Sequence, residues 1–150
     1  MTDCLTAVEK SAQEKHIAIK KKLPDNYPTL IGDKELLKTA IINLLGNAVK
    51  YTPENGEITF SMAEAEEKVI IEVTDTGYGV SEEELPHIFD KFYRSQNPNI
   101  LEQKGSGLGL AMTSEIIQLH DGKIEVQSEL DKGTQFTVKL PREEIYLAEQ

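Results

Sequence analysis

The stretch Asn43-Leu-Leu-Gly-Asn47-Ala-Val-Lys50-Tyr51 combines an apolar helical stripe with two amides and an ammonium group. The stripe extends toward the N-terminus at helical spacing, which predicts a helix with Asp33 as its N-cap. Asn43, Asn47 and Lys50 follow at intervals of four and three residues, so they share one face of that helix. Amide oxygens can bind a metal ion and an ammonium can bind a phosphate. On this helix alone, however, a solvated polar face is the simpler explanation, because such spacing is common.

The rest of the chain alternates between helical and strand periodicity in an order that indicates one fold class. Before the central helix we expect a helix over about 3–16 and a strand over 17–23. After it we expect strands over 58–62 and 69–73, a short helix from Ser81 to about Phe89, a helix that ends at His120, and strands over 124–126 and 136–140. This order predicts an α+β fold, a two-layer sandwich in which helices cover one face of a mixed β-sheet.

Composition and charge limit the number of domains and the classes of function. A chain of 150 residues with 39% hydrophobic residues fits one compact domain over 1–150. The net charge of −10 argues against binding of nucleic acid, and the single cysteine, Cys4, excludes an internal disulfide and a cysteine zinc cluster. With no membrane-spanning segment or signal peptide, we expect a cytoplasmic domain without direct membrane contact. Whether a full-length protein is attached to a membrane stays open.

A second motif, Asp75-Thr-Gly77-Tyr-Gly79, follows directly after the predicted strand 69–73. The glycines allow a sharp turn of the backbone beside the carboxylate. A buried carboxylate here could accept a hydrogen bond from the exocyclic amine of adenine, and it would repel the carbonyl that guanine presents at the same place. The simpler alternative is a strand-to-helix turn in which Asp75 caps Gly77, and this short motif does not decide between the two.

A third motif, Gly105-Ser106-Gly107-Leu108-Gly109, precedes the predicted helix that ends at His120. Glycines at a helix start let amide N–H groups face an anion, and the helix dipole adds partial positive charge, which suits a polyphosphate. No Gly-Lys-Ser/Thr ending makes it a Walker loop, and no strand precedes it as in a dinucleotide fingerprint. The polar segment 94–104 before it lacks periodicity, and loops of this length are usually functional or disordered.

Together the motifs are far more specific than any one of them. Their order along the chain is Asn43–Tyr51, Asp75–Gly79, Phe89-Asp-Lys-Phe92-Tyr93-Arg94 and Gly105–Leu110. In this order they resemble the asparagine, first glycine, phenylalanine and second glycine boxes of the catalytic, ATP-binding domain of sensor histidine kinases. Gly133-Thr134 matches the later Gly-Thr element, and the resemblance covers nearly the whole chain. It implies the Bergerat ATP-binding fold, with ATP held between the helices and a lid over about 94–107.

The resemblance also implies a role for each matching residue. The catalytic positions would be Asn43, Asn47 and Lys50, with Asn47 binding Mg²⁺ through its amide oxygen and Lys50 meeting a phosphate. Asp75 would accept the adenine amine, while Phe89 and Phe92 would anchor the start of the lid or belong to the core. The nucleotide-binding positions would be Tyr51, Asp75, Gly77, Gly79, Arg94, Lys104, Gly105, Ser106, Gly107, Leu108, Gly109 and Thr134.

The phosphoacceptor motif of this family, a histidine followed by an acid and then Arg-Thr-Pro, does not occur in the chain. We interpret His16, His87 and His120 as structural, with His120 as a favourable cation at the end of its helix. The resemblance therefore implies a catalytic domain without its dimerisation domain. It would transfer the γ-phosphoryl group of Mg-ATP to a histidine on that separate domain, and a response regulator receiver domain would be a further partner.

Two other functions stay open at this point. An ATPase of the same fold would carry a glutamate where this chain has Asn43, and an amide cannot activate water as a general base. A non-catalytic module would bind nucleotide without transferring phosphate to any histidine. The predicted lid has few basic residues, namely Arg94 and Lys104, so the sequence does not identify the residue that contacts the γ-phosphate.

Overall fold

The computed structural model of the chain describes residues 2–25, 28, 30–97 and 109–142. The helices are α1 (Thr2–Glu14), α2 (Lys34–Lys50) and α4 (Gly109–Leu119), with a short 3₁₀ helix η1 (Leu85–His87). The strands are β1 (Ala18–Lys22), β2 (Glu57–Ala65), β3 (Lys68–Asp75), β4 (Lys123–Glu129) and β5 (Gly133–Pro141). Within this part of the chain, no helix has the length and apolar character needed to cross a membrane.

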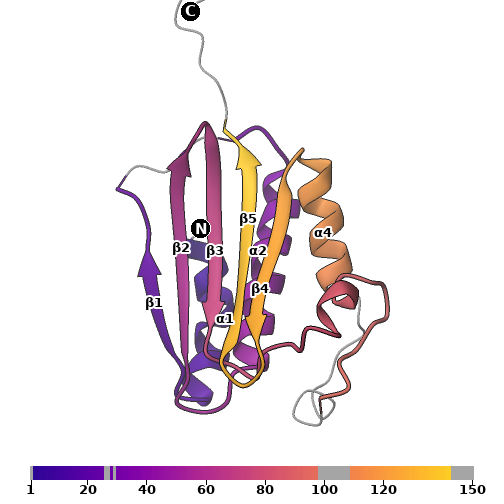
Figure 1. Cartoon of the computed structure of the whole chain (residues 1–150). Coiled ribbons are helices and arrows are strands. Elements are labelled where there is room, and N and C mark those ends of the chain that lie inside the picture. Colours follow the sequence, from indigo (N-terminus) through magenta and orange to yellow (C-terminus); the bar gives the residue numbers. More distant parts are fainter. Residues whose placement is uncertain (1, 26–27, 29, 98–108, 143–150) are drawn as a thin grey trace, which may run out of the picture.

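The strands form one mixed sheet in the order β1-β2-β3-β5-β4. β1 pairs with β2 in parallel, and the other neighbouring pairs are antiparallel. The helices lie on one face of this sheet, with α2 between α1 and α4 (Figure 1). The predicted two-layer α+β sandwich with a mixed sheet is therefore confirmed.

Helix α2 forms where its sequence places a cap and an apolar stripe. The Asp33 carboxylate accepts a hydrogen bond from the N–H of Leu36 at 3.0 Å, which satisfies one of the free donors at the helix start. The buried side chains Ala40, Ile41, Leu44, Leu45, Ala48 and Val49 face the sheet. In β2 and β3 the alternate residues predicted to point inward are buried, including Phe60 and Val73. The C-terminal end of α2 is thereby fixed above the end of β3.

The short helix predicted from Ser81 to Phe89 is wrong in its extent. The Ser81 hydroxyl does accept from the N–H of Glu84 at 3.3 Å, but the only helical residues are those of η1. Pro86 lies in this turn and has no N–H to donate, so an α-helical ladder cannot continue through it. The Glu84 side chain bonds elsewhere, as described below. Phe89 packs on the core with its ring 6.2 Å from that of Phe136.

The role predicted for His120 as a helix-end cation is also wrong. Its Nδ1 lies 2.8 Å from the carbonyl of Ile116, so this nitrogen must donate. Its Nε2 accepts a hydrogen bond from the N–H of Asp33 at 2.9 Å. A ring with one donor and one acceptor nitrogen is neutral. The absence of a side chain at Gly32 makes the contact possible, since a Cβ there would lie 2.4 Å from Cδ2 of His120.

Replacement of His120 by alanine should lower the free energy of unfolding by about 1 kcal/mol, because the hydrogen bond from Asp33 that joins the end of α4 to the start of α2 is lost, together with the local one to Ile116. Urea denaturation of the variant and parent measures the change. Gln118→Ala is the matched control, since this exposed side chain lies on the same helix. Equal destabilisation by both substitutions would mean that the His120 bridge contributes nothing specific.

Candidate functional site

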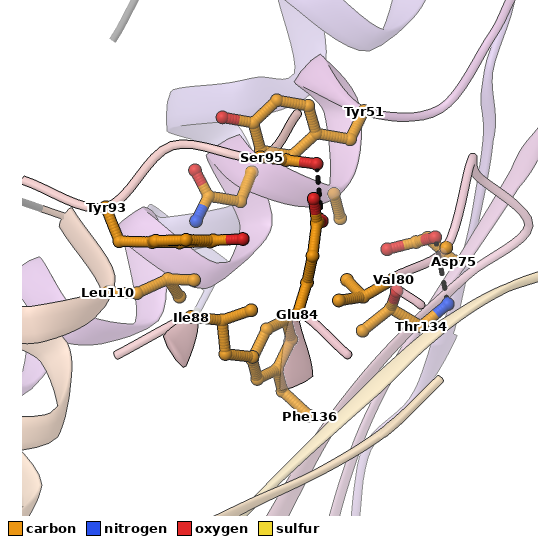
Figure 2. Close-up of a pocket in the computed structure, with 13 residues that line it drawn as sticks. Tyr51, Asp75, Val80, Glu84, Ile88, Tyr93, Ser95, Leu110, Thr134 and Phe136 are labelled. Carbon is orange, nitrogen blue, oxygen red and sulfur yellow. Dashed lines mark hydrogen bonds between the residues drawn. The ribbon is translucent and has the colours of Figure 1, made fainter. Parts of the chain in front are cut away.

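A cavity opens between the C-terminal end of α2 and the adjoining ends of β3 and β5, with a volume of about 100 Å³. Of the residues predicted for the site, five line it, namely Asn47, Tyr51, Asp75, Gly79 and Thr134. The other lining residues are Ala48, Val80, Glu84, Ile88, Tyr93, Ser95, Leu110 and Phe136. Figure 2 shows polar groups of Asp75 and Thr134 on one side and apolar side chains on the other. The cavity is thus suited to a largely apolar group with a few polar atoms.

Asp75 is the buried charged residue of this cavity, at the end of β3 with 8% of its surface exposed. Its Oδ1 accepts hydrogen bonds from the N–H of Gly77 at 2.8 Å and the N–H of Thr134 at 3.3 Å. Burial raises the pKa of Asp75 to about 6, although these two hydrogen bonds act in the opposite direction. Within the described part of the chain, Oδ2 accepts no hydrogen bond. This oxygen can therefore accept one from a ligand in the cavity.

Gly77 and Gly79 are required by the packing of the chain against itself. A Cβ on Gly77 would lie 2.3 Å from the carbonyl oxygen of Tyr51, which accepts from the N–H of Tyr78 at 3.0 Å. Gly79 has a φ of +71°, and a Cβ there would lie 2.1 Å from the carbonyl oxygen of Glu129. These contacts fix the turn after β3 against α2 and the β4–β5 turn. That the glycines also let backbone approach a base stays a prediction.

The three polar residues predicted on α2 have different surroundings. Asn47 lines the cavity, whereas Asn43 lies one turn earlier, and its Nδ2 donates to the carbonyl of Gly109 and to Oγ1 of Thr113, both at 3.4 Å. Asn43 therefore joins α2 to the first turn of α4. The ammonium of Lys50 lies 5.3 Å from the centre of the Tyr51 ring. Partial burial lowers the pKa of Lys50, and the nearby guanidinium of Arg94 lowers it further.

Thr134 belongs to a small hydroxyl network at the rim. Ser128 Oγ accepts from the N–H of Val80 at 2.7 Å and donates to the carbonyl of Gly133 at 2.9 Å. Its one proton is then used, so the Thr134 hydroxyl must donate across the 2.8 Å contact with Ser128. The lone pairs of Thr134 stay available to a donor in the cavity.

Glu84 and Ser95 also line the cavity, although neither was predicted for the site. The carboxylate of Glu84 accepts from the hydroxyl of Ser95 at 2.6 Å and from the N–H of Gln96 at 2.9 Å. Figure 2 shows the Glu84 side chain between Phe136 and Ser95, across the cavity. Ser81 and Glu84 stand at the Ser-x-x-Glu spacing of a helix-capping box, and this local role gives no signal for the second one. The apolar lining residues Ile88 and Phe136 also belong to the core, so their sequence pattern does not distinguish them from other core residues.

Removal of the Glu84 carboxylate should increase local opening of the backbone at Ser95 and Gln96, which it holds by hydrogen bonds. In Glu84→Ala we expect the amide hydrogen of Gln96 to exchange about tenfold faster or more, because a hydrogen bond to a charged group is lost. Amide exchange followed by NMR measures this. The matched control is Glu83→Ala, an exposed neighbouring acid. Unchanged exchange at Gln96 in Glu84→Ala would contradict the assigned contact.

Several predicted site residues lie outside the described part of the chain. These are Lys104, Gly105, Ser106, Gly107 and Leu108, together with most of the predicted lid. Of the remaining positions, Gly109 is the first residue of α4 and Arg94 lies near Lys50 and Tyr51. Phe92 does not pack in the core, since 71% of its surface is exposed.

The chain belongs to the family of histidine kinase-, DNA gyrase B-, and HSP90-like ATPases, whose family model matches residues 32–144. This membership and the sensor-kinase matches below confirm the predicted resemblance to the catalytic domains of sensor histidine kinases.

Among known proteins, the chain is similar to the adaptive-response sensory kinase SasA of Rippkaea orientalis, with 38% identity over 93% of this chain and 35% of the relative. It is also similar to the sensor histidine kinase WalK of Bacillus subtilis, with 37% identity over 88% of this chain and 22% of the relative. The chain thus spans about a third or less of the length of these curated relatives.

Solved structures also match this chain along nearly its whole length. Full-length ShkA in complex with AMPPNP matches with a TM-score of 0.82 and 30% identity, over 94% of this chain and 29% of that chain. The catalytic domain of the histidine kinase ThkA matches with a TM-score of 0.81 and 26% identity, over 94% and 90% of the two chains.

Proposed function

We propose that this chain is the ATP-binding catalytic domain of a two-component sensor histidine kinase. It transfers the γ-phosphoryl group of Mg-ATP to a histidine on a separate dimerisation domain, in the cytoplasm, and a response regulator receiver domain takes the phosphoryl group from there. The family and the sensor kinases similar to this chain support the proposal. The observation that carries it is the buried carboxylate of Asp75, with one oxygen left for a ligand.

Asp75 would select the base. The N–H groups of Gly77 and Thr134 hold Oδ1, so that Oδ2 accepts from the exocyclic amine of adenine. Guanine would present a carbonyl at that place, and two acceptors would then face each other in a buried site, which is costly. Tyr51 and the apolar wall of Ile88, Leu110 and Phe136 would pack against the ring.

The residues near the cavity fit magnesium held jointly by protein and phosphates. No group of three or more carboxylate, histidine or cysteine side chains that could hold a metal ion occurs among the described residues. Asn47, which lines the cavity, would offer one amide oxygen, while phosphate oxygens and water would complete an octahedral shell. The bound ion would neutralise phosphate charge.

The chain's own residues would position the phosphates but would not activate water for hydrolysis. Lys50 and Arg94 would neutralise phosphate charge, and Lys104 with the glycine-rich segment from Gly105 to Gly109 would bind phosphates at the start of α4. Asn43 would support the phosphate end from one turn before Asn47. Its amide cannot take a proton from water, which favours transfer to a histidine of another domain over hydrolysis.

A nucleotide titration tests the first step of this proposal. We expect the chain to bind ATP at least about tenfold more tightly than GTP, because only adenine can donate the buried hydrogen bond to the charged carboxylate of Asp75. Isothermal titration calorimetry with and without Mg²⁺ measures both affinities and the contribution of the metal ion. Equal affinity for the two nucleotides would contradict the role of Asp75, and no binding of either would contradict the function.

A further inference from the structure

A second cavity lies toward the N-terminal end of α2, with a volume of about 250 Å³ against about 100 Å³ for the Asp75 cavity. The two cavities share no lining residue. Figure 1 shows why they are separate, since α2 runs along the sheet from the end where β5 finishes to the end where β2 begins. A ligand in the second cavity would therefore not compete with one beside Asp75.

The floor of the second cavity is apolar and belongs largely to the core. It is formed by Cys4, Leu30, Leu37, Ile41, Ile71 and Leu140. The side chains of Cys4, Ile41, Ile71 and Leu140 are at most 2% exposed and belong to the core. An apolar cavity of about 150 Å³ in another protein is large enough to bind benzene. A hydrocarbon chain of several carbons therefore has room here.

The rim of this cavity carries positive charge. Lys34 and Lys38 line it together with one acid, Asp3, which lies 3.7 Å from the ammonium of Lys38. Lys34 makes no ion pair with any described residue. The rim thus has a net charge of about +1, on a chain whose overall net charge is −10. An apolar floor with a few convergent polar groups is typical of small-molecule sites.

We infer that this cavity binds a small amphipathic monoanion, a carboxylate on a short hydrocarbon chain. The carboxylate lies between the ammonium groups of Lys34 and Lys38, and the hydrocarbon chain packs against Ile41, Ile71 and Leu140. The site does not depend on nucleotide binding, because it contains none of the residues that line the Asp75 cavity.

Octanoate is the probe for this site, with octan-1-ol and acetate as its two comparison ligands. In an NMR titration of the chain, octanoate should shift the amide signals of residues 3–4 and 34–41. We expect octan-1-ol to bind at least about tenfold more weakly because it has no charge for the lysines, and acetate to cause no shifts because it lacks the chain. Equal binding of the alcohol, or octanoate shifts centred on Asp75 instead, would overturn the assignment.

Variants that remove one lysine charge distinguish binding at this site from nonspecific binding to an apolar surface. Lys34→Gln should weaken octanoate about fivefold or more and leave octan-1-ol unchanged, whereas Lys10→Gln, at an exposed position of α1, should bind both like the parent. Asp75→Asn should also bind octanoate like the parent, so this result is independent of the proposed kinase function. An equal loss of octanoate affinity in Lys34→Gln and Lys10→Gln would contradict the proposed site.

Discussion

Asp75→Asn should lose ATP affinity by about tenfold or more while the fold stays as stable as that of the parent at neutral pH or more so. Asparagine can still accept the N–H groups of Gly77 and Thr134 through its Oδ1, so the turn after β3 is preserved. The group that replaces Oδ2, however, is an NH₂ donor, which would face the amine of adenine. Loss of a hydrogen bond to a charged group costs on the order of 1.5–3 kcal/mol. Calorimetric titration with ATP measures the change, with Asp131→Asn, at an exposed acid, as the control.

The ionisation of Asp75 should make the free energy of unfolding and the affinity for ATP respond to pH in opposite directions. The pKa of Asp75 is raised from 3.8 to about 6 in the fold, so between these values the folded chain holds a proton that the unfolded chain has lost. The contribution of Asp75 to the free energy of unfolding therefore falls as pH rises through this window. The amide introduced by Asp75→Asn does not ionise, so the variant should gain stability relative to the parent as pH rises from about 4 to 6.

The ATP affinity of the parent should fall as pH drops below about 6, because the protonated carboxyl is a poorer acceptor for the adenine amine. ATP itself also takes up protons in acid, so the comparison is made against Asp75→Asn, which lacks only the Asp75 contribution. A parent and variant with the same affinity and the same pH dependence would contradict the placement of the base beside Asp75.

Local patterns were sufficient to predict α2 and the strands. Asp33 is followed by an apolar stripe of period 3.6, and the buried residues of β2 and β3 alternate, so each element could be predicted from its own residues. The place of Asp75 was also predictable, since a residue at the end of a central strand lies at the edge of the sheet beside the helix layer.

Contacts between distant residues could not be predicted in the same way. Glu84 has a local explanation as a capping residue, and its actual partner Ser95 is 11 residues further along the chain. The neutral state of His120 depends on the N–H of Asp33, which lies 87 residues away. The apolar lining of the cavity by Ile88 and Phe136 follows from packing, because a core residue and a pocket residue have the same sequence pattern.

The isolated chain should bind Mg-ATP but neither hydrolyse it briskly nor label itself. A positioned general base typically contributes about 10² to 10⁴ to a rate, and the amide of Asn43 supplies none. Neither His87, which pairs with Asp90 at 3.2 Å, nor His120, whose ring nitrogens bond to Ile116 and Asp33, has the sequence context of a phosphoacceptor. We therefore expect transfer only when another domain presents a histidine with an adjacent acid.

A radiolabel assay with γ-labelled ATP separates the three functions that the sequence left open. We expect no labelled protein with the chain alone, an acid-labile and base-stable label on an added cognate dimerisation domain, and no label when the histidine of that domain is replaced. Rapid release of phosphate by the chain alone would favour the ATPase. Bound ATP without labelling of the cognate domain would favour the non-catalytic module, and Asp75→Asn, which keeps the fold, gives the background for each measurement.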